Sequence, residues 1–173
     1  GQYLDISFET RIDVTQEEYW RMAAGKTAAM FAAPFAMGAI IAGAEPRIVE
    51  AFRAFGHHIG LAFQAVDDIL GIWGDSALTG KPVGDDLLSR KMTCPVIAAL
   101  DAGGDASALL RRAYQQPARP DEDVASLAAF VAETGARALT QAMAEQEQAA
   151  ALDALRAAGV AADVIARDDS GGW

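Results

Sequence analysis

Cysteine, positive charge and strand-forming patterns are all scarce in this chain of 173 residues. Cys94 is its one cysteine, so no disulfide can form within the chain. Lysine and arginine total 14 against 24 aspartates and glutamates, and the resulting formal net charge of −10 repels nucleic acid phosphates at long range. Few stretches alternate apolar and polar residues with period two, as half-buried strands do. A disulfide scaffold, a nucleic-acid-binding protein and a β protein are therefore poor first interpretations.

Alanine-rich apolar sequence is abundant instead, and it accounts for much of the 52% hydrophobic content. Alanine is the best helix former, so we expect an all-α fold, with residues 1–173 as one domain and 168–173 as a frayed tail. The apolar stretch from Thr27 to Ala44 contains Pro34 and two glycines, which indicates a buried core helix rather than a membrane span. No signal peptide is visible, and a cytoplasmic location is the default expectation.

Capping signals and apolar spacing place the expected helices. Thr15 and Glu18 form a capping box, which predicts that a helix starts there. It should run to Ile41, with a kink where Pro34 removes a backbone hydrogen bond. The glycine-rich and aspartate-rich stretch 74–86 is typical of a loop. Further helices are predicted over Pro46–Trp73, Leu87–Leu100 with a break at Pro95, Ala106–Gln115, Asp121–Glu133 and Ala136–Ala158.

The candidate chemistry lies between residues 60 and 96. Asp67 and Asp68 fall late in the second predicted helix, where neighbouring carboxylates repel each other and the negative end of the helix dipole. A divalent cation would relieve that repulsion, and hard oxygen ligands favour Mg²⁺ together with a substrate phosphate. The following loop supplies lysines and aspartates that suit a phosphate met by both ammonium groups and metals: Lys81, Asp85, Asp86 and Lys91.

These residues stand in a recognisable order. The run FQAVDDILGIWGD followed by TGKPVGDDLLSRK resembles the second aspartate-rich region of the trans-isoprenyl diphosphate synthases, the polyprenyl synthetase family. That family shows FQ, two residues, DDxxD, then GK, a glycine-rich turn, an aspartate and a final lysine. GQYLDISFE is similar to its GQxxD stretch, and GKTAAMFAAP to its KTA segment. The four matches follow the family's order across residues 1–96, while residues after 100 match only in being helical and alanine-rich.

The resemblance implies a Mg²⁺-dependent site. In it, Asp67 and Asp68 would be metal ligands, and Gln64 would orient the bound substrate or its diphosphate. Lys26 and Lys81 would contact the diphosphate of the allylic substrate. The implied fold is an antiparallel helical bundle of the isoprenoid synthase type that lacks its N-terminal helices.

Other positions would support this site. Lys91 would add positive charge near the diphosphate, and the carbonyl and hydroxyl of Thr27 would stabilise an allylic cation. Gln2 and Asp5 would lie near the substrate cavity. The implied reaction is the condensation of an allylic prenyl diphosphate with isopentenyl diphosphate, and family members are usually homodimers.

Two departures from the family pattern matter. Gly71 replaces the third aspartate of DDxxD, and Asp75 could substitute only if the loop folded back. The family's first aspartate-rich motif, which precedes GQxxD, is absent from this chain. Because the chain begins without an initiator methionine, we expect a missing or separately supplied upstream half, and we expect the fragment alone to be inactive.

The favoured interpretation is a prenyltransferase in which this chain supplies the second aspartate-rich half of the site, as a homodimer or in complex with an N-terminal-half chain. A class I terpene cyclase ranks lower, because no NSE-type motif is evident. A non-catalytic helical subunit of a prenyl synthase is favoured modestly by Gly71. The retained Lys26, Gln64, Lys81 and Lys91 count against that subunit.

Overall fold

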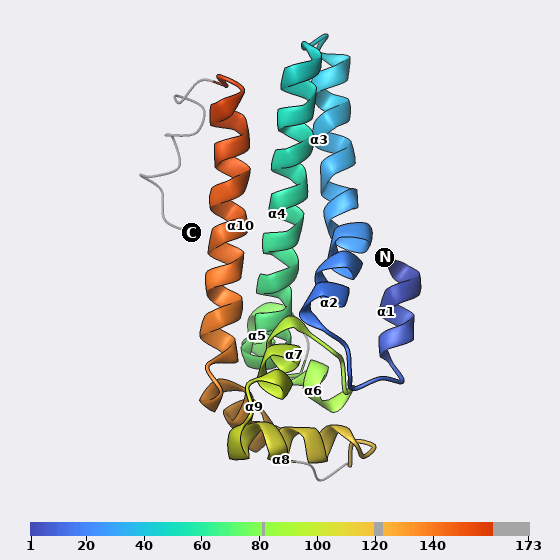
Figure 1. The fold of residues 1–173 in the computed structure, drawn as a ribbon, viewed down its shortest axis with the longest axis vertical. Helices are drawn as coiled ribbons and strands as arrows, with labels where there is room; N and C mark the ends of the chain where they lie inside the picture. Colours follow the sequence, from blue (N-terminus) through green and yellow to red (C-terminus); the bar gives the residue numbers. More distant parts are fainter. Residues whose placement is uncertain (81, 120–122, 161–173) are drawn as a thin grey trace.

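The described part of the chain is built from helices alone (Figure 1). The computed structural model describes residues 1–80, 82–119 and 123–160. Within these ranges every regular element is helical, which confirms the predicted all-α class. The predicted frayed tail over 168–173 and the first residues of the predicted helix Asp121–Glu133 lie outside the described residues.

Three long helices lie side by side in one layer: α3 (Ala29–Ile41), α4 (Pro46–Trp73) and α10 (Ala136–Ala157). Helix α4 occupies the middle of the layer and packs against both neighbours, antiparallel to each (Figure 1). Its bounds are those that the sequence predicts, and Pro46 lies in its first turn. Gly43 adopts a positive φ of 70° after the end of α3, as expected for the glycine that closes a helix.

The first long helical stretch is interrupted by a π-helical turn that the sequence did not predict. Helix α2 (Gln16–Ala23) starts with the predicted capping box, in which the Thr15 hydroxyl accepts from the backbone N–H of Glu18 at 3.2 Å. The π-helix η1 (Ala24–Ala28) follows and leads into α3. Pro34 lies inside α3, so the departure from α-helical geometry comes one to two turns before the proline, at η1.

Short helices pack around the lower end of the layer. They are α1 (Gln2–Phe8), α5 (Ser76–Thr79), α6 (Asp85–Leu88), α7 (Cys94–Asp101), α8 (Gly104–Tyr114) and α9 (Val124–Glu133). The predicted helix Leu87–Leu100 is therefore two helices, and Pro95 stands in the first turn of α7 rather than at a break within it. The largest core cluster gathers here, with Tyr19, Ile72 and Leu110 fully buried.

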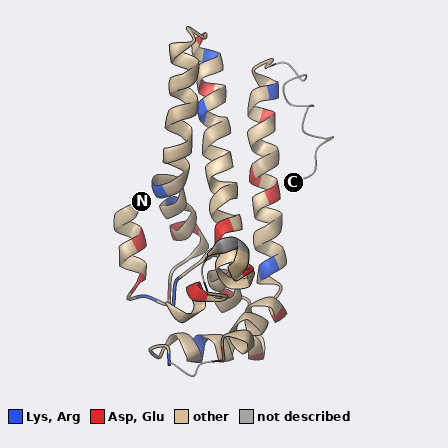
Figure 2. Ribbon diagram, turned by 180° about the vertical axis from the view of Figure 1, so that it is seen from behind, with Lys and Arg blue, Asp and Glu red and all other residues tan. Residues whose placement is uncertain are grey.

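The outer faces of α3 and α4 are thinly covered. Helix α3 carries no charged residue (Figure 2), yet only Ala36 and Ala39 are buried in it. Several large apolar side chains of α3 and α4 are exposed, namely Met30, Met37, Ile40, Ile41, Phe63, Val66 and Leu70. The expected buried core helix over 27–44 is thus mostly uncovered, because the described chain places nothing against its outer side.

By length and composition the stretch Gln16–Ile41 could also cross a membrane, with a mean hydropathy of 1.3. Core helices of water-soluble proteins pass the same test, so this property alone does not distinguish the two cases.

Two glycines of α4 let η1 and α3 approach it closely. A Cβ added at Gly60 would lie 2.5 Å from the Cα of Ala28, and one added at Gly56 would lie 2.8 Å from the carbonyl oxygen of Phe31. Backbone atoms cannot give way as a flexible side chain can, so this contact depends on the absence of side chains.

We expect Gly60→Ala to destabilise the fold by about 1–3 kcal/mol, because its methyl group pushes the backbone of η1 at Ala28 away from α4. Gly38→Ala is the matched control, since a Cβ there meets nothing within 4 Å. The control should be neutral or up to about 1 kcal/mol more stable, because alanine favours a helix over glycine. Urea unfolding of both variants measures the difference, and equal stability of the two would contradict the packing described.

Candidate functional site

The carboxylate of Asp68, only 1% exposed, is the centre of a hydrogen-bond cluster at the lower end of α4. Its Oδ2 accepts from the Tyr19 hydroxyl at 2.6 Å and from the backbone N–H of Cys94 at 2.8 Å. Its Oδ1 accepts from Nε2 of Gln64 at 3.0 Å. One buried charge thereby joins α2, α4 and the start of α7.

Burial of the Asp68 carboxylate disfavours its charged form. Burial raises the pKa of Asp68 from 3.8 to about 6, although the Lys91 charge and the three hydrogen bonds act in the opposite direction. Burial and then the negative charge of Asp68 raise the pKa of Tyr19 well above 10, so Tyr19 stays a proton donor. The site therefore holds a carboxylate whose pKa is raised to about 6.

Lys91 lies at the edge of this cluster. Its Nζ is 3.8 Å from Oδ1 of Asp68 and 3.5 Å from Oδ2 of Asp86, which is largely buried. Burial disfavours the ammonium, but the carboxylates of Asp68 and Asp86 outweigh that effect and raise the pKa of Lys91. Lys91 is thus a fixed positive charge at neutral pH, shared between two acids from different helices.

The Asp86 carboxylate lies over Gly71. A Cβ added to Gly71 would be 2.0 Å from Oδ2 and 2.6 Å from Cγ of Asp86. The space next to the position of the family's third aspartate therefore already holds a carboxylate, supplied by α6. Gly71 is one helical turn beyond Asp67, so the Asp86 carboxylate lies on the same side of α4 as Asp67.

The π-helical turn supplies the other side of the site. The Thr27 hydroxyl donates to Oε1 of Gln64 at 2.6 Å, while Nε2 of the same amide donates to Asp68. Both ends of the Gln64 amide are thus fixed. Lys26, the neighbour of Thr27, forms an ion pair with Asp5 of α1 at 2.5 Å.

The structure brings together only part of the predicted set. Thr27, Gln64, Asp68 and Lys91 form one connected cluster. Asp67 is half-buried, and its carboxylate carries no hydrogen bond or ion pair to the described residues. Lys81 lies outside the described residues. Asp75 caps α5, where its carboxylate accepts from the backbone N–H of Ala77 at 2.9 Å.

Two members of the cluster were missed by the sequence reasoning. Tyr19 stands in an amphipathic helix, where its position indicates a core residue, and it meets Asp68 from 49 positions away. The N–H of Cys94 is a backbone group at a helix start. No local pattern in the sequence pairs either donor with Asp68.

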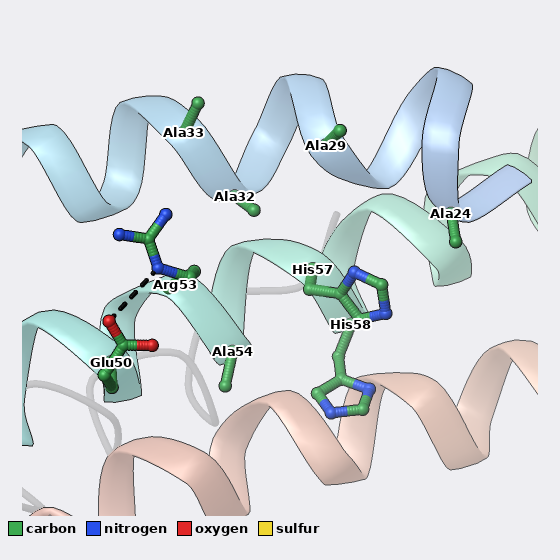
Figure 3. A pocket seen from close by; sticks show the side chains of 9 residues that line it. All are labelled: Ala24, Ala29, Ala32, Ala33, Glu50, Arg53, Ala54, His57 and His58. Atoms are coloured by element: carbon green, nitrogen blue, oxygen red, sulfur yellow. Dashed lines mark hydrogen bonds and ion pairs between the residues drawn. The ribbon is translucent and has the colours of Figure 1, made fainter. Parts of the chain in front are cut away.

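Two hollows lie near these helices. A cavity of about 470 Å³ opens beside Lys91, between α1 and the turn before α7, and Asp5, Phe8 and Met92 help to line it. A shallow groove of about 440 Å³ lies between α3 and α4 (Figure 3). Five alanines line the groove together with Glu50, Arg53, His57 and His58. His57 precedes Asp67 by ten residues, about 15 Å along the helix, so the groove is separate from the Asp68 cluster.

The donor set fits a hard cation bound jointly with a phosphorylated ligand. Among the described residues, no three histidine, cysteine, aspartate or glutamate side chains are grouped as a metal site. Both oxygens of Asp68 accept hydrogen bonds but keep a free lone pair on Oδ1, so Asp67, Asp68 and the nearby Asp86 are the candidate carboxylates. Mg²⁺ commonly takes one or two carboxylates and completes its shell with water and phosphate oxygens. Metal ligation by Asp67 and Asp68 stays a prediction.

The raised pKa of Asp68 predicts a pH-dependent stability. Between pH 3.8 and about 6 the folded chain keeps a proton on Asp68 that the unfolded chain has lost, so the free energy of unfolding falls as pH rises. Asp68→Asn cannot ionise and should lack this loss, which is roughly 3 kcal/mol once pH exceeds 6. Urea unfolding of both proteins at pH 4 and pH 7.5 measures it. Parallel pH profiles would show that Asp68 titrates normally.

Comparison with known proteins gives a family match and similar relatives. The family model described as polyprenyl synthetase matches residues 1–131. Over 167 residues the chain is 45% identical to the geranylgeranyl diphosphate synthase of Mycobacterium tuberculosis, which covers 96% of this chain and 48% of that protein. The chain therefore spans about half the length of the relatives it matches.

Solved structures agree in fold. The polyprenyl synthetase of Streptomyces coelicolor A3(2) superposes with a TM-score of 0.85 at 41% identity, covering 90% of this chain and 48% of that one. The geranylgeranyl pyrophosphate synthase of Corynebacterium glutamicum, complexed with isoprenyl diphosphate and magnesium, gives 0.81 at 34% identity, covering 90% and 44%. The matched model, the identity to relatives and the shared helical fold place this chain in the polyprenyl synthetase family.

Proposed function

We propose that this chain supplies the second aspartate-rich half of a prenyltransferase site, which condenses an allylic diphosphate with isopentenyl diphosphate. The observation that carries the proposal is the fixed ammonium of Lys91 between Asp68 and Asp86, next to Asp67. The Lys91 ammonium suits an anionic diphosphate, and the carboxylates around it suit the metal ions that accompany such a ligand. The relatives named above act in this reaction class, and one is complexed with isoprenyl diphosphate and magnesium.

The reaction begins when the C–O bond of the allylic diphosphate breaks and its electron pair leaves with the diphosphate. The double bond of isopentenyl diphosphate then attacks the allylic carbon, a new C–C bond forms and a proton is lost. Groups that are already in place when charge develops are the most effective stabilisers of such a departure. Lys91 meets this requirement, since its position is set by two acids and a tight turn before any ligand arrives.

Lys26 is the second proposed contact for the allylic diphosphate. It is half-exposed and paired with Asp5, so a more highly charged diphosphate can compete for its ammonium. Lys81, which lies outside the described residues, remains a predicted third contact.

Gln64 is proposed to orient the substrate rather than to react. Its amide is held at one end by Thr27 and at the other by Asp68. A side chain fixed at both ends keeps one rotamer without paying further ordering entropy when a ligand binds. The Thr27 hydroxyl, whose proton goes to Gln64, keeps oxygen lone pairs that can face an allylic cation.

Mg²⁺ fits the site as the proposed cofactor. Asp67 and Asp68 would hold it, and Asp86, whose carboxylate lies over Gly71, would contribute directly or through water. Asp68 would also orient Gln64 and Lys91. When bound, Mg²⁺ supplies positive charge that neutralises the diphosphate oxygens.

The uncovered apolar side chains support a missing half of the fold. Phe63, Val66 and Leu70 of α4 are 41–53% exposed and follow one another at helical spacing next to Asp67. An apolar wall beside the diphosphate site would keep water from the allylic cation once further helices cover it. We propose that those helices come from an N-terminal half of the same protein or from a second chain, in a cytoplasmic homodimer or complex.

Gly71 no longer favours a non-catalytic subunit over an enzyme. Its lack of a side chain makes room for Asp86, which places a carboxylate next to the position of the missing aspartate.

Calorimetry with inorganic pyrophosphate tests the site in this chain. We expect Asp67→Asn to weaken binding roughly tenfold in Mg²⁺ and to change it little in EDTA, because the carboxylate acts through the metal. Lys91→Ala should weaken binding in both conditions, since an ammonium contact needs no metal. Asp101→Asn, an exposed acid at the end of α7, is the charge-matched control. Loss of the Mg²⁺ dependence in the control as well would remove the assignment to Asp67.

Elongation assays test the division of labour. We expect the 173-residue chain alone to produce no prenyl product from isopentenyl diphosphate, an allylic diphosphate and Mg²⁺. The same chain fused behind the N-terminal half of the Mycobacterium tuberculosis relative, which is 45% identical over the matched region, should elongate the allylic substrate. Product from the chain alone would refute the half-site proposal, as would a folded but inactive fusion.

A further inference from the structure

The turn that delivers Lys91 contains an unusual backbone conformation. Arg90 has a φ of 55°, and it is the one residue other than glycine with a positive φ among those that the structure describes. A side chain in this left-handed region meets steric cost, so the conformation persists only where the surroundings hold it. The strained residue directly precedes the lysine that faces Asp68 and Asp86.

The Arg90 side chain is anchored away from the site. Its Nη1 donates to the carbonyl of Leu87 at 2.9 Å, and its Nε donates to the carbonyl of Gln116 at 3.1 Å. The guanidinium also lies 5.4 Å from the centroid of the Tyr114 ring. Gln116 and Tyr114 belong to the end of α8 and the turn after it, so the arginine ties the turn to a separate helix.

The same helix also contacts Lys91. The hydroxyl of Tyr114 donates to the carbonyl of Lys91 at 3.4 Å. Within the turn, the backbone N–H of Lys91 donates to the backbone carbonyl of Asp86 at 2.9 Å, and that of Thr93 donates to the backbone carbonyl of Lys91 at 3.0 Å. The backbone around Lys91 is therefore held on both sides, and the left-handed step at Arg90 determines the direction in which its side chain leaves.

We propose that Arg90 is a positioning residue for Lys91. Its guanidinium binds the carbonyls of Leu87 and Gln116 and stabilises the left-handed turn, which places the Lys91 ammonium between the two carboxylates. The role of Lys91 toward a diphosphate rests on the proposed function, whereas the effect of Arg90 on the turn does not.

Hydrogen exchange measured by NMR tests the effect on the turn without any ligand. Arg90→Ala should speed amide exchange at Lys91 and Thr93, because the left-handed step loses its anchors. Arg112→Ala is the matched control, since it removes one exposed arginine from α8. Unchanged exchange at both amides in Arg90→Ala would overturn the proposal, whether or not the chain binds diphosphate.

Affinity for inorganic pyrophosphate in EDTA separates positioning from general stability. Arg90→Ala should weaken binding about fivefold, and adding Arg90→Ala to Lys91→Ala should cause no further loss, because Arg90 acts through Lys91. Arg90→Gly should fall between wild type and Arg90→Ala, since glycine adopts φ 55° freely but has no side chain to anchor. Additive losses in the double variant, or wild-type affinity of Arg90→Gly, would overturn the proposal.

If the wild-type chain binds no pyrophosphate, the proposed function fails on its own. The exchange measurement then still decides whether Arg90 holds the turn.

Discussion

The buried carboxylate of Asp68 is the constraint on which the lower half of the molecule depends. A charge removed from water must be met by donors, and here the donors come from three separate helices. Tyr19, Gln64 and the N–H of Cys94 can satisfy it together only when α2, α4 and α7 are packed in one arrangement. The cost of burial thus specifies the geometry: a misplaced helix would leave an acid without partners.

Charge and shape are matched around Lys91 in the same way. Asp68 and Asp86 come from different helices, and the Lys91 ammonium, which contacts both, relieves their mutual repulsion. Asp86 can approach only because Gly71 has no side chain. A glycine in α4, an acid in α6 and a lysine before α7 therefore form one unit, and a change in any of them alters the surroundings of the other two.

Local signals predicted the helices well and the site only in outline. The capping box of Thr15 and Glu18 and the proline at position 46 act within one turn, so they can be recognised in the sequence. The aspartate pair and its family resemblance indicated where the site lies. Tyr19 reaches it through a contact between distant segments, which no local pattern encodes. Asp86 was indicated as a loop acid, but its place over Gly71 was not. Helix α1 and the π-helical turn were also missed, because neither carries a distinctive capping signal.

The π-helical turn has a consequence for how α2 and α3 relate to each other. Each residue of an α-helix advances the rotation by about 100°, so one additional residue in a turn rotates everything after it by that amount. Tyr19 must face Asp68 while Ala28 faces Gly60, and the wide turn η1 follows the first of these residues and ends at the second. The π-helical turn therefore sets the rotation of α3 about the helix axis relative to α2. Deleting one residue from Ala24–Ala28 would restore a regular helix and put the two contacts out of phase.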